Sequence, residues 1–530
     1  MPVKSKDEQP EYPFTGPFGG IQSECALDQI GTHGFAEAQN LLFRKSQMQI
    51  APSLSFTPTI GPSQPVIGMA DFYPAGSSIG VHYSVVWTVS SMFYWNAITQ
   101  TWNQVTGTLS TSGPLPIMQW DVVGYKLYFS QGNDPVQVWD GNTGSFGLSG
   151  TGAVPAKYIC ELGFHLLAAN TVEAGPTFAP NRVHWSAAGD GTNWTSFDSG
   201  QADLFNGLGP INGLCRLFQT GYAFQVEGIT QIVPTGQGLA PFQFITMGSR
   251  AKGSTLPYAL ASSGESIACY VGKDNIYSFD GTESYPIGSH PIDGNRQLGA
   301  RKRILADIIS VGGTYQANFV TGFILTSAFG VDYNSYWITI PTLNKAWVYH
   351  FDEGSWTQFF FPAGFTPQGP VGSFSPLLSY YNQLSPYDSI AFSNVAIPPE
   401  SSKLGYLDFK QPGNSPTNDS INATDGWYVR SGQLTFDDSR HLHTVKRVRL
   451  VMTDLAANIL SMRWTNENGQ QTPVQQISYG SGSGNMVTKV IEFSLPGKFL
   501  TWELSGPPNI KFALSEIAPI GDTGGEVRGG

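Results

Sequence analysis

The sequence predicts an all-β protein, and three features lead to that prediction. Charged residues make up only 13% of the 530 residues, whereas soluble domains average roughly 25%. Aromatic residues make up a further 13%, and the chain contains 61 glycines and 36 prolines. Aromatic side chains favour strands, and glycine and proline favour the tight turns that join them. The third feature is a strand-and-turn unit that recurs along the chain.

The recurring unit consists of an alternating apolar strand, an aromatic residue, an Asp or Asn, a Gly/Thr turn and a second aromatic residue. Its first aromatic position is occupied in four copies by Trp95, Trp139, Trp185 and Phe279. The intervals are 44, 46 and 94 residues, and the weaker segment 229–235 divides the last interval. Such a period is typical of a β-propeller blade. We therefore expect a β-propeller of about six blades over residues 67–410, with five or seven left open.

The turn of this unit is clearest in "NRVHWSAAGDGTNWTSFDSG", residues 181–200. We expect Asp190 to accept hydrogen bonds from backbone N–H groups two residues on, Gly191 to adopt a positive φ, and Trp194 to pack between neighbouring blades. The stretch partly resembles the Asp-box of sialidase-like propellers, which is a structural turn remote from catalysis. It therefore predicts architecture and not chemistry.

The segments around the propeller have their own patterns. Residues 1–66 are expected to form an N-terminal arm and docking segment, with a short helix over "GFAEAQNLLF" because its apolar residues share a helical face. A last copy of the unit has Phe351 as its first aromatic residue, 72 residues after Phe279, so an insertion that contains the basic stretch 300–313 is expected before it.

The C-terminal quarter begins after a linker, residues 411–424, which is rich in Pro, Asn, Ser and Thr. Residues 425–520 contain six alternating apolar segments, which predict a C-terminal antiparallel β-sandwich. Residues 521–530, "GDTGGEVRGG", are expected to be a flexible tail.

Composition excludes several classes of protein. The net charge of −11 argues against a dedicated nucleic-acid binder. The four cysteines lie far apart, which predicts reduced thiols and neither a disulfide framework nor structural zinc. The sequence has no run of 18 apolar residues and no signal-peptide pattern, so we expect no membrane-spanning segment and assembly in a cytoplasm.

A catalytic centre is not expected. A glycosidase needs two carboxylates at a fixed separation, and the candidate carboxylates all occupy turns of the recurring unit: Asp190, Asp203, Asp280, Asp352 and Glu353. The arginines that a sialidase would need to grip an acidic sugar are scattered one per blade, which neither excludes nor supports that activity: Arg182, Arg216, Arg250 and Arg296. We therefore predict no enzymatic activity, no catalytic residues and no cofactor.

Two other patterns bear on binding. His441 and His443 could face one side of a strand and hold a metal, but no third ligand is evident, so a solvated or packed pair is favoured and no metal is expected. The basic clusters comprise Arg301, Lys302, Arg303, Arg440, Lys446, Arg447 and Arg449. They are either solvated surface or contacts with an acidic partner or with DNA phosphate.

Three segments in this order carry a resemblance to a known family. They are "GGIQSECALDQIGTHGFAEAQNLLFRKSQMQI" (19–50), "RVHWSAAGDGTNWTSF" (182–197) and "ESIACYVGKDNIYSFDGTESYPIG" (265–288). Together they resemble the tail nozzle proteins of short-tailed bacteriophages, also called packaged-DNA stabilisation or head-completion proteins. The resemblance covers most of residues 15–410.

The resemblance implies a structural virion protein of the phage tail that assembles in the host cytoplasm. Six copies would form a ring below the portal and adaptor, continue and close the DNA channel, retain the packaged genome and permit its ejection. The implied partners are further copies of the chain, the portal–adaptor proteins, tail fibres or spikes, and passing genomic DNA without sequence specificity. Two alternatives stay open: a glycan-binding or glycan-hydrolysing propeller that serves as a receptor-binding tail protein, and a protein-interaction scaffold with no phage connection.

Overall fold

The computed structural model describes most of the chain between residues 13 and 526. The described ranges are 13–15, 18–30, 34–44, 46–50, 53–56, 66–75, 83–96, 99, 101–110, 117–142, 144–173, 175, 177–291, 297–311, 320–325, 334–361, 389–392, 405–408, 426–434, 441–453, 458–479, 484–507 and 513–526. Within these ranges the protein is nearly all β, with one α-helix, α1 (Arg301–Ser310), and short 3-10 turns at Leu27–Gln29 and Pro341–Leu343. None of the described helices has both the length and the apolar character needed to cross a membrane.

Five four-stranded antiparallel sheets follow one another along the chain. The first two contain β6 (Val66–Phe72), β7 (Tyr83–Thr88), β8 (Met92–Asn96) and β9 (Thr101–Val105), then β10 (Gln119–Val123), β11 (Lys126–Ser130), β12 (Gln137–Trp139) and β13 (Gly147–Leu148). The next two contain β14 (Ala156–Leu162), β15 (His165–Glu173), β16 (Thr177–Trp185) and β17 (Gly200–Asp203), then β18 (Ile211–Leu217), β19 (Thr220–Gln225), β20 (Ile229–Pro234) and β21 (Phe242–Thr246). The fifth contains β22 (Ala261–Ser262), β23 (Ala268–Val271), β24 (Ile276–Phe279) and β25 (Ser284–Pro286).

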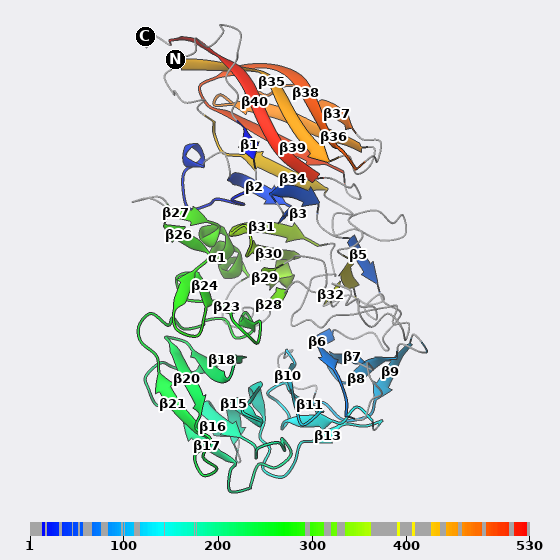
Figure 1. The fold of residues 1–530 in the computed structure, drawn as a ribbon, viewed down its shortest axis with the longest axis vertical. Coiled ribbons are helices and arrows are strands. Elements are labelled where there is room, and N and C mark those ends of the chain that lie inside the picture. The colour runs from blue at the N-terminus through cyan, green and yellow to red at the C-terminus, as the bar shows by residue number, and fades with distance from the viewer. Residues whose placement is uncertain are drawn as a thin grey trace.

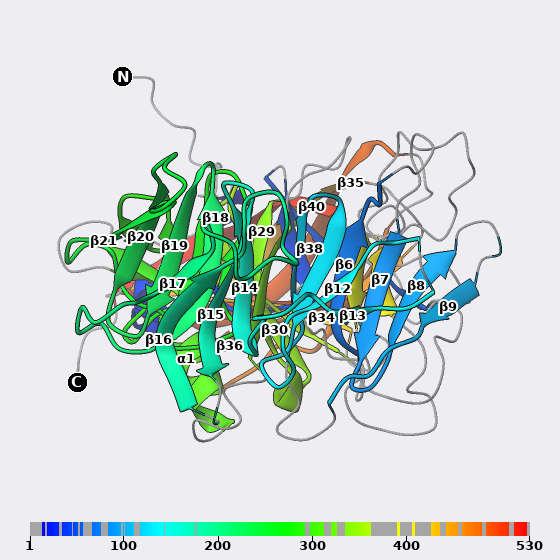
Figure 2. The same ribbon diagram turned by 90° about the horizontal axis from the view of Figure 1, so that it is seen from below.

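Two further groups of strands continue the series. A four-stranded group contains β28 (Thr321–Leu325), β29 (Ser335–Ile340), β30 (Lys345–His350) and β31 (Ser355–Phe360), and a three-stranded sheet contains β32 (Ser389–Phe392), β33 (Gly405–Asp408) and β5 (Ser53–Phe56). Figure 1 shows these groups side by side around a common centre, with β6, β10, β18 and β28 facing inward. From below, β6–β9 and β18–β21 lie on opposite sides of the arrangement (Figure 2). The fold is therefore propeller-like, as the recurring unit predicted.

The recurring unit coincides with one strand position in every sheet. Trp95, Trp139, Trp185 and Phe279 all lie on the third strand of their sheets, and the weaker segment 229–235 overlaps β20, which is also a third strand. Phe351 directly follows β30. Between the fifth sheet and β28 the chain inserts the hairpin of β26 (Ser289–Pro291) and β27 (Gln297–Gly299), followed by α1.

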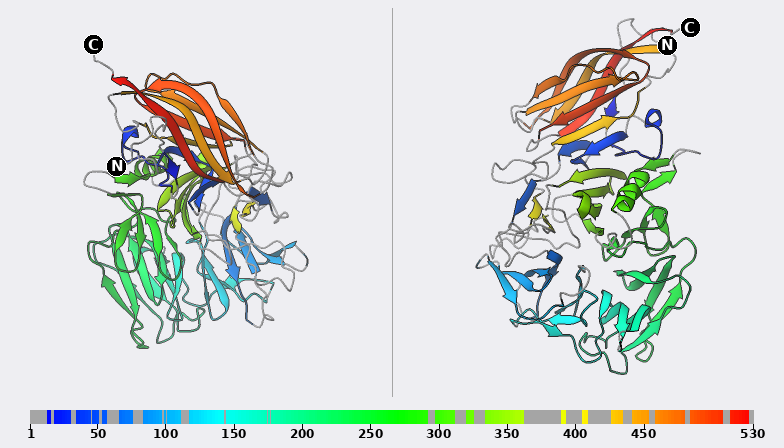
Figure 3. Two further views of the ribbon diagram at one scale, coloured as in Figure 1. Left: turned by 45° about the horizontal axis from the view of Figure 1, so that its top comes forward. Right: turned by 180° about the vertical axis from the view of Figure 1, so that it is seen from behind.

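Both ends of the chain build a two-sheet sandwich on one side of the propeller-like body (Figure 3). The first sheet has the order β3-β4-β40-β35-β38, with β1 beside β40, and the second continues from β31 as β2-β34-β39-β36-β37. The N-terminal strands are β1 (Phe14–Thr15), β2 (Phe35–Gln39), β3 (Leu41–Arg44) and β4 (Gln47–Ile50). The C-terminal strands are β34 (Trp427–Ser431), β35 (His441–Thr453), β36 (Asn458–Asn466), β37 (Gln475–Tyr479), β38 (Met486–Gly497), β39 (Leu500–Gly506) and β40 (Ala513–Glu526).

Three sequence predictions differ from this arrangement. The helix predicted over "GFAEAQNLLF" is wrong: the segment forms β2 and β3, because β2 pairs with β34 and Asn40 between them adopts φ 56°, which no right-handed helix allows. The sandwich predicted from residues 425–520 alone also includes β1–β4 and the additional strand β37. The tail predicted to be flexible from residue 521 continues β40 to Glu526, since that backbone pairs with β35; residues 527–530 and the linker 411–424 lie outside the described residues.

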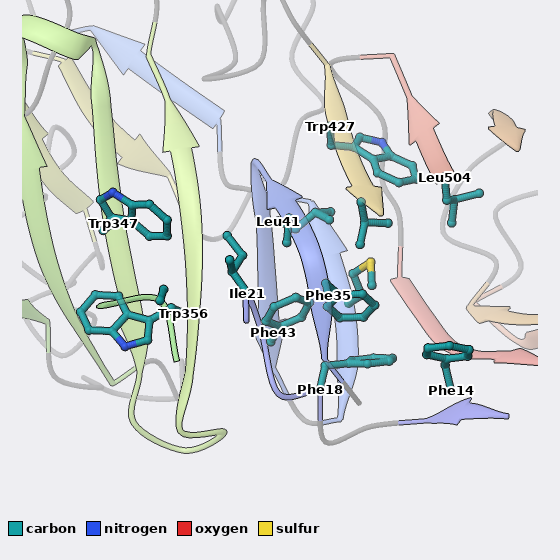
Figure 4. Packing of buried hydrophobic residues seen from close by; sticks show 14 of the residues in the cluster. Phe14, Phe18, Ile21, Phe35, Leu41, Phe43, Trp347, Trp356, Trp427 and Leu504 are labelled. Carbon is teal, nitrogen blue, oxygen red and sulfur yellow. The ribbon is translucent and has the colours of Figure 1, made fainter. Parts of the chain in front are cut away.

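One core connects the sandwich to the propeller-like body. Its buried side chains include residues of β1–β3, β31, β34 and β39, and Figure 4 shows Phe18, Phe35 and Phe43 packed together between Trp356 and Leu504. The ring centroids of Phe35 lie 5.6 Å from those of both Phe18 and Phe43. Such aromatic burial contributes strongly to stability. Because residues of both parts belong to this one cluster, the two parts share one hydrophobic interior.

Candidate functional site

The centre of the ring of sheets holds a cavity of about 390 Å³. Its walls come from the inner strands β10, β14, β18, β22 and β28, and they include Trp120, Tyr158 and Phe323. Two cysteines on these strands, Cys160 and Cys215, also line it. Burial raises the pKa of the Cys160 thiol, and it raises the pKa of Cys215 to about 12. Both thiols are therefore protonated and unreactive at neutral pH, and the four cysteines, all of which lie in the described ranges, form no disulfide with one another.

Asp121 is the acidic group on the wall of this cavity. Its carboxylate accepts hydrogen bonds from the backbone N–H groups of Val122 at 2.7 Å and Glu161 at 2.6 Å. Desolvation by the surrounding protein raises the pKa of Asp121 to about 6, against the opposing effects of the Val122 bond, the Arg216 cation and a bond with Cys160. Asp121 could not be recognised from the sequence, because "QWDVVG" resembles any other strand with one polar residue.

A groove of about 890 Å³ adjoins the central cavity, and Arg216 lines both. Three hairpin turns form much of its wall: β10–β11, β14–β15 and β18–β19. The tip of each turn presents an aromatic side chain to solvent: Tyr125 is 68% exposed, Phe164 75% and Phe218 66%. Exposed aromatic groups gathered around one concave surface are typical of binding sites.

These three aromatic residues share an unusual backbone conformation. Their φ angles are 62°, 68° and 54°, in the left-handed region. Seven non-glycine residues among the described ones have a positive φ. Tyr125, Phe164 and Phe218 are the three aromatic residues among them, and the other four are Asn or Ser. A bulky residue in this region costs of order 1–3 kcal/mol. The sequence retains a large ring at each tip where Asn or Gly would fit with less strain.

A signal for two of the tips exists in the sequence. "VVGYKLYF" and "ELGFHLLA" both place Gly and one aromatic residue between two apolar segments, which is the pattern of a two-residue hairpin. "CRLFQTGYAF" lacks the glycine before Phe218, so that tip could not be found in the same way.

The predicted turn chemistry is present in the structure. The carboxylate of Asp190 accepts hydrogen bonds from the backbone N–H of Thr192 at 3.0 Å and from its hydroxyl at 2.5 Å. Asp280 binds Thr282 in the same way, at 2.8 and 2.7 Å. Trp194 donates from its indole nitrogen to the hydroxyl of Ser149 at 3.0 Å and packs between the second and third sheets.

Gly191 does not have the positive φ that was predicted for it. The positive φ of this turn belongs to Gly189, at 73°. Gly191 is required for a different reason, because a Cβ atom there would lie 2.6 Å from the ring of Tyr128 on β11. The constraint is therefore the close approach of two neighbouring sheets.

The candidate carboxylates are distributed over three groups of strands. Asp190 and Asp203 belong to the β14–β17 sheet, Asp280 to the β22–β25 sheet, and Asp352 and Glu353 to the turn after β30. The hydroxyl of Thr192 holds the pKa of Asp190 below its usual value, and Arg182, at 2.7 Å, does so for Asp203. A general acid needs a raised pKa, so both groups suit a structural role.

Two more of the candidate arginines form ion pairs within the chain, and His441 and His443 both lie on β35. Arg216 forms an ion pair with Glu161, and Arg250 pairs with Glu283 at 2.6 Å. His443 is buried within β35, and no group of three His, Cys, Asp or Glu residues in the described ranges could hold a metal ion. Arg296 lies outside the described residues.

The first basic cluster belongs to α1. Arg301 pairs at 2.9 Å with Glu24, whose side chain is fully buried, and the backbone N–H of Lys302 donates to the same carboxylate at 2.7 Å. Arg303 approaches Glu37 of β2 to 3.9 Å. Arg301 and Lys302 thus attach the N-terminal segment to the helix through Glu24. Glu24 is an acidic partner within the chain for a basic cluster that the sequence left open as a contact for DNA phosphate.

The second basic cluster belongs to β35, a strand of the sandwich. Arg449 pairs with Glu516 at 2.6 Å, and Arg447 lies 3.6 Å from Glu492 with both side chains largely exposed. Lys446 is on the same strand, while Arg440 lies outside the described residues. The two clusters therefore occupy different elements, α1 and β35, and each has acidic partners within the chain.

The N-terminal segment "GGIQSE" (19–24) is the joint between the parts of the molecule. Ile21 donates from its backbone N–H to Trp356 on β31 at 2.8 Å, and Ser23 donates to Gly299 at 2.8 Å. Gly20 has φ +67°, and a Cβ there would lie 2.6 Å from the carbonyl oxygen of Trp356. Figure 4 shows Ile21 between Trp356 and the β2–β3 aromatic residues. The first segment of the family resemblance is therefore the one that packs the propeller-like body against the sandwich.

Comparisons with known proteins provide no family for the chain. No protein-family model matches it, and no curated protein matches it. Among solved structures, U3-55K is similar at TM-score 0.37 and 8% identity, covering 67% of this chain and 98% of that one. The BBS1N chain of a complex with ARL6DN gives TM-score 0.38 and 6% identity, covering 70% and 98%. An exo-β-1,3-galactanase from Phanerochaete chrysosporium with galactose gives TM-score 0.27 and 11% identity, covering 89% and 100%.

Proposed function

We propose that the protein is a structural component of a phage tail, namely its nozzle. Six copies would form a ring that lies below the portal and adaptor and surrounds the DNA channel. The observation that carries the proposal is the place of the motif "GGIQSE" and the "AEAQN" that follows it. These residues resemble the nozzle family, and in this chain they join the propeller-like body to the sandwich through Gly20, Ile21 and Asn40.

The proposal includes a finer description of the body as a closed propeller of seven blades. Five blades are the four-stranded sheets from β6 to β25, the sixth is β28–β31, and the seventh consists of β32 and β33 completed by β5. In the sequence, β5 precedes the first blade and β33 follows the sixth blade. Their antiparallel pairing would therefore close the ring by joining a segment from before the blades to one from after them. Closure of this kind leaves no exposed sheet edge along the ring of blades.

The charge of the chain agrees with a conduit for DNA. A net charge of −11 gives the assembled ring an acidic character, and acidic walls repel phosphates over a distance of about 8–10 Å at physiological salt. DNA would then pass without sticking. The ring would be held by repeated contacts between different faces of neighbouring copies, which is how cyclic oligomers close.

Two experiments test the proposal. Electron microscopy of the purified protein, alone and with a portal–adaptor complex of a short-tailed phage, should show a six-fold ring seated on that complex. Particles made without the protein should package DNA and then lose it, and wild-type protein supplied in trans should restore retention. Particles that lack the protein yet keep their genome and infect normally would overturn the proposal, as would a protein that stays monomeric on the portal–adaptor complex.

A further inference from the structure

We propose that the groove between the β10–β11, β14–β15 and β18–β19 hairpins binds a neutral, linear oligosaccharide whose sugar rings stack on Tyr125, Phe164 and Phe218. The proposal goes beyond the nozzle function and does not depend on it. It concerns the binding of sugar only and involves no hydrolysis.

The first argument is the row of aromatic tips. They occur at the same turn, between the first and second strands, of three successive sheets. Tyr125 and Phe164 are the second residue of their two-residue turns and Phe218 is the first, so equivalent hairpins of three successive sheets each carry one ring along the groove. A ligand that uses all three must itself be extended and repetitive, with an apolar face on each unit, as pyranose rings have.

The backbone that carries the three rings is held in place before a ligand arrives. Every turn is limited to two residues by the register of its strands: Val123 pairs with Lys126, Leu162 with His165, and Leu217 with Thr220. The carboxylate of Glu161 also accepts the backbone N–H of Phe164 at 2.8 Å, which anchors the middle tip. A backbone that is already ordered loses little entropy on binding, and this favours weakly interacting ligands such as sugars.

The third argument is the charge of the groove. Its thirteen lining residues include one acid, Glu161, and one base, Arg216, and these two form an ion pair with each other. A ligand with many phosphates or sulfates would need an excess of positive charge, which these lining residues do not supply. Gln219 and Thr220 add polar groups at the wall, so the groove offers hydrogen bonds to hydroxyl groups beside neutral apolar platforms.

The test uses the full-length protein and measures binding by isothermal titration and saturation-transfer NMR. The neutral probes are cellohexaose, maltohexaose and chitohexaose, and a heparin-derived hexasaccharide is the anionic comparison. We expect at least one neutral probe to bind and the heparin fragment not to bind. Each of the substitutions Tyr125→Asn, Phe164→Asn and Phe218→Asn should weaken that binding by about tenfold, or ~1.4 kcal/mol.

Asn is chosen because it adopts a positive φ readily, so the hairpins should fold and the melting temperature should hold or rise. Phe205→Asn is the matched control, since Phe205 is 84% exposed and is absent from the residues that line the groove; it should leave binding unchanged. Tyr125→Phe should keep most of the affinity. Saturation transfer should reach the ring protons of the bound sugar.

Three outcomes would overturn the proposal. One is that no neutral probe binds at millimolar concentration. Another is that a probe binds equally well to the Tyr125→Asn/Phe164→Asn/Phe218→Asn triple variant. The third comes from selection of a random peptide library on the wild-type protein: peptides that lose binding to the triple variant, with no sugar bound, would identify the occupant as a peptide.

Discussion

The side-chain amide of Asn40 donates a hydrogen bond to the carbonyl oxygen of Gly426 over 2.8 Å, and the two residues are 386 positions apart in the chain. The backbone N–H of Asn40 donates to Gln358 on β31 at 2.8 Å, and its side-chain oxygen accepts from the N–H of Phe360 at 2.8 Å. One buried residue between β2 and β3 thus joins the last strand of the β28–β31 group to the first C-terminal strand of the sandwich.

Replacement of Asn40 by Ala should lower the free energy of unfolding by about 2–4 kcal/mol. The substitution removes two side-chain hydrogen bonds and leaves their buried partners unsatisfied. It also places alanine at φ 56°, a left-handed conformation that Asn tolerates better than Ala does. Urea unfolding followed by circular dichroism measures the change. Asn40→Gly is the control, because glycine tolerates the backbone angle and so isolates the hydrogen bonds. Equal stability of all three proteins would show that the joint does not depend on this side chain.

Arg301 and Arg447 should differ sharply when each is replaced by Ala. Loss of Arg301 leaves the fully buried Glu24 carboxylate without its cation and should cost about 3 kcal/mol. Loss of Arg447 should change stability by less than about 1 kcal/mol, because that side chain and its partner Glu492 are 55% and 81% exposed. Denaturant unfolding of both variants decides the matter. A comparable, small effect of the two substitutions would mean that α1 does not anchor the N-terminal segment through Glu24.

Acid should destabilise the protein through His350. Burial lowers the pKa of this imidazole to about 3, and its Nε2 atom lies 2.8 Å from the hydroxyl of Thr357. Below its ordinary pKa of 6.5 the unfolded chain takes up a proton that the folded chain refuses, so stability is present above pH 6.5 and is lost as the pH falls. Between about pH 7 and pH 4.5 the loss from this residue should be about 2–3 kcal/mol. His350→Gln should reduce the loss of unfolding free energy between about pH 7 and pH 4.5 by that amount.

Asp121 should act in the opposite direction. Its folded-state pKa of about 6 lies above the ordinary 3.8, so the folded protein keeps a proton that the unfolded chain releases, and stability from this group falls as the pH rises from about 4 to 6. The stability of Asp121→Asn relative to wild type should therefore increase by about 2–3 kcal/mol between pH 4 and pH 7. Thermal and urea unfolding over this range would measure it. A difference that is constant with pH would place the carboxylate's pKa near its ordinary value.

The sequence by itself predicted the all-β fold class and the recurring unit, because both depend on local chemistry. Asp followed by Gly and Thr makes the same side-chain to backbone bonds at Asp190 and at Asp280, whichever residues surround them. An alternating apolar segment that ends in an aromatic residue becomes the third strand of a sheet at Trp95, Trp139 and Trp185. These interactions span a few residues, so they can be read along the chain.

Only the tertiary structure decided which distant residues meet. Phe35 and Leu41 belong to a segment whose apolar residues suit a helix or strands equally, and pairing with β34 and the left-handed Asn40 selected strands. Arg301 found Glu24 across 277 positions. The three exposed aromatic tips face one groove because their sheets are neighbours around the ring. Contacts of this kind depend on how whole sheets pack against one another. The packing energy arises between residues that are far apart in the sequence, so it cannot be read from short stretches of the chain.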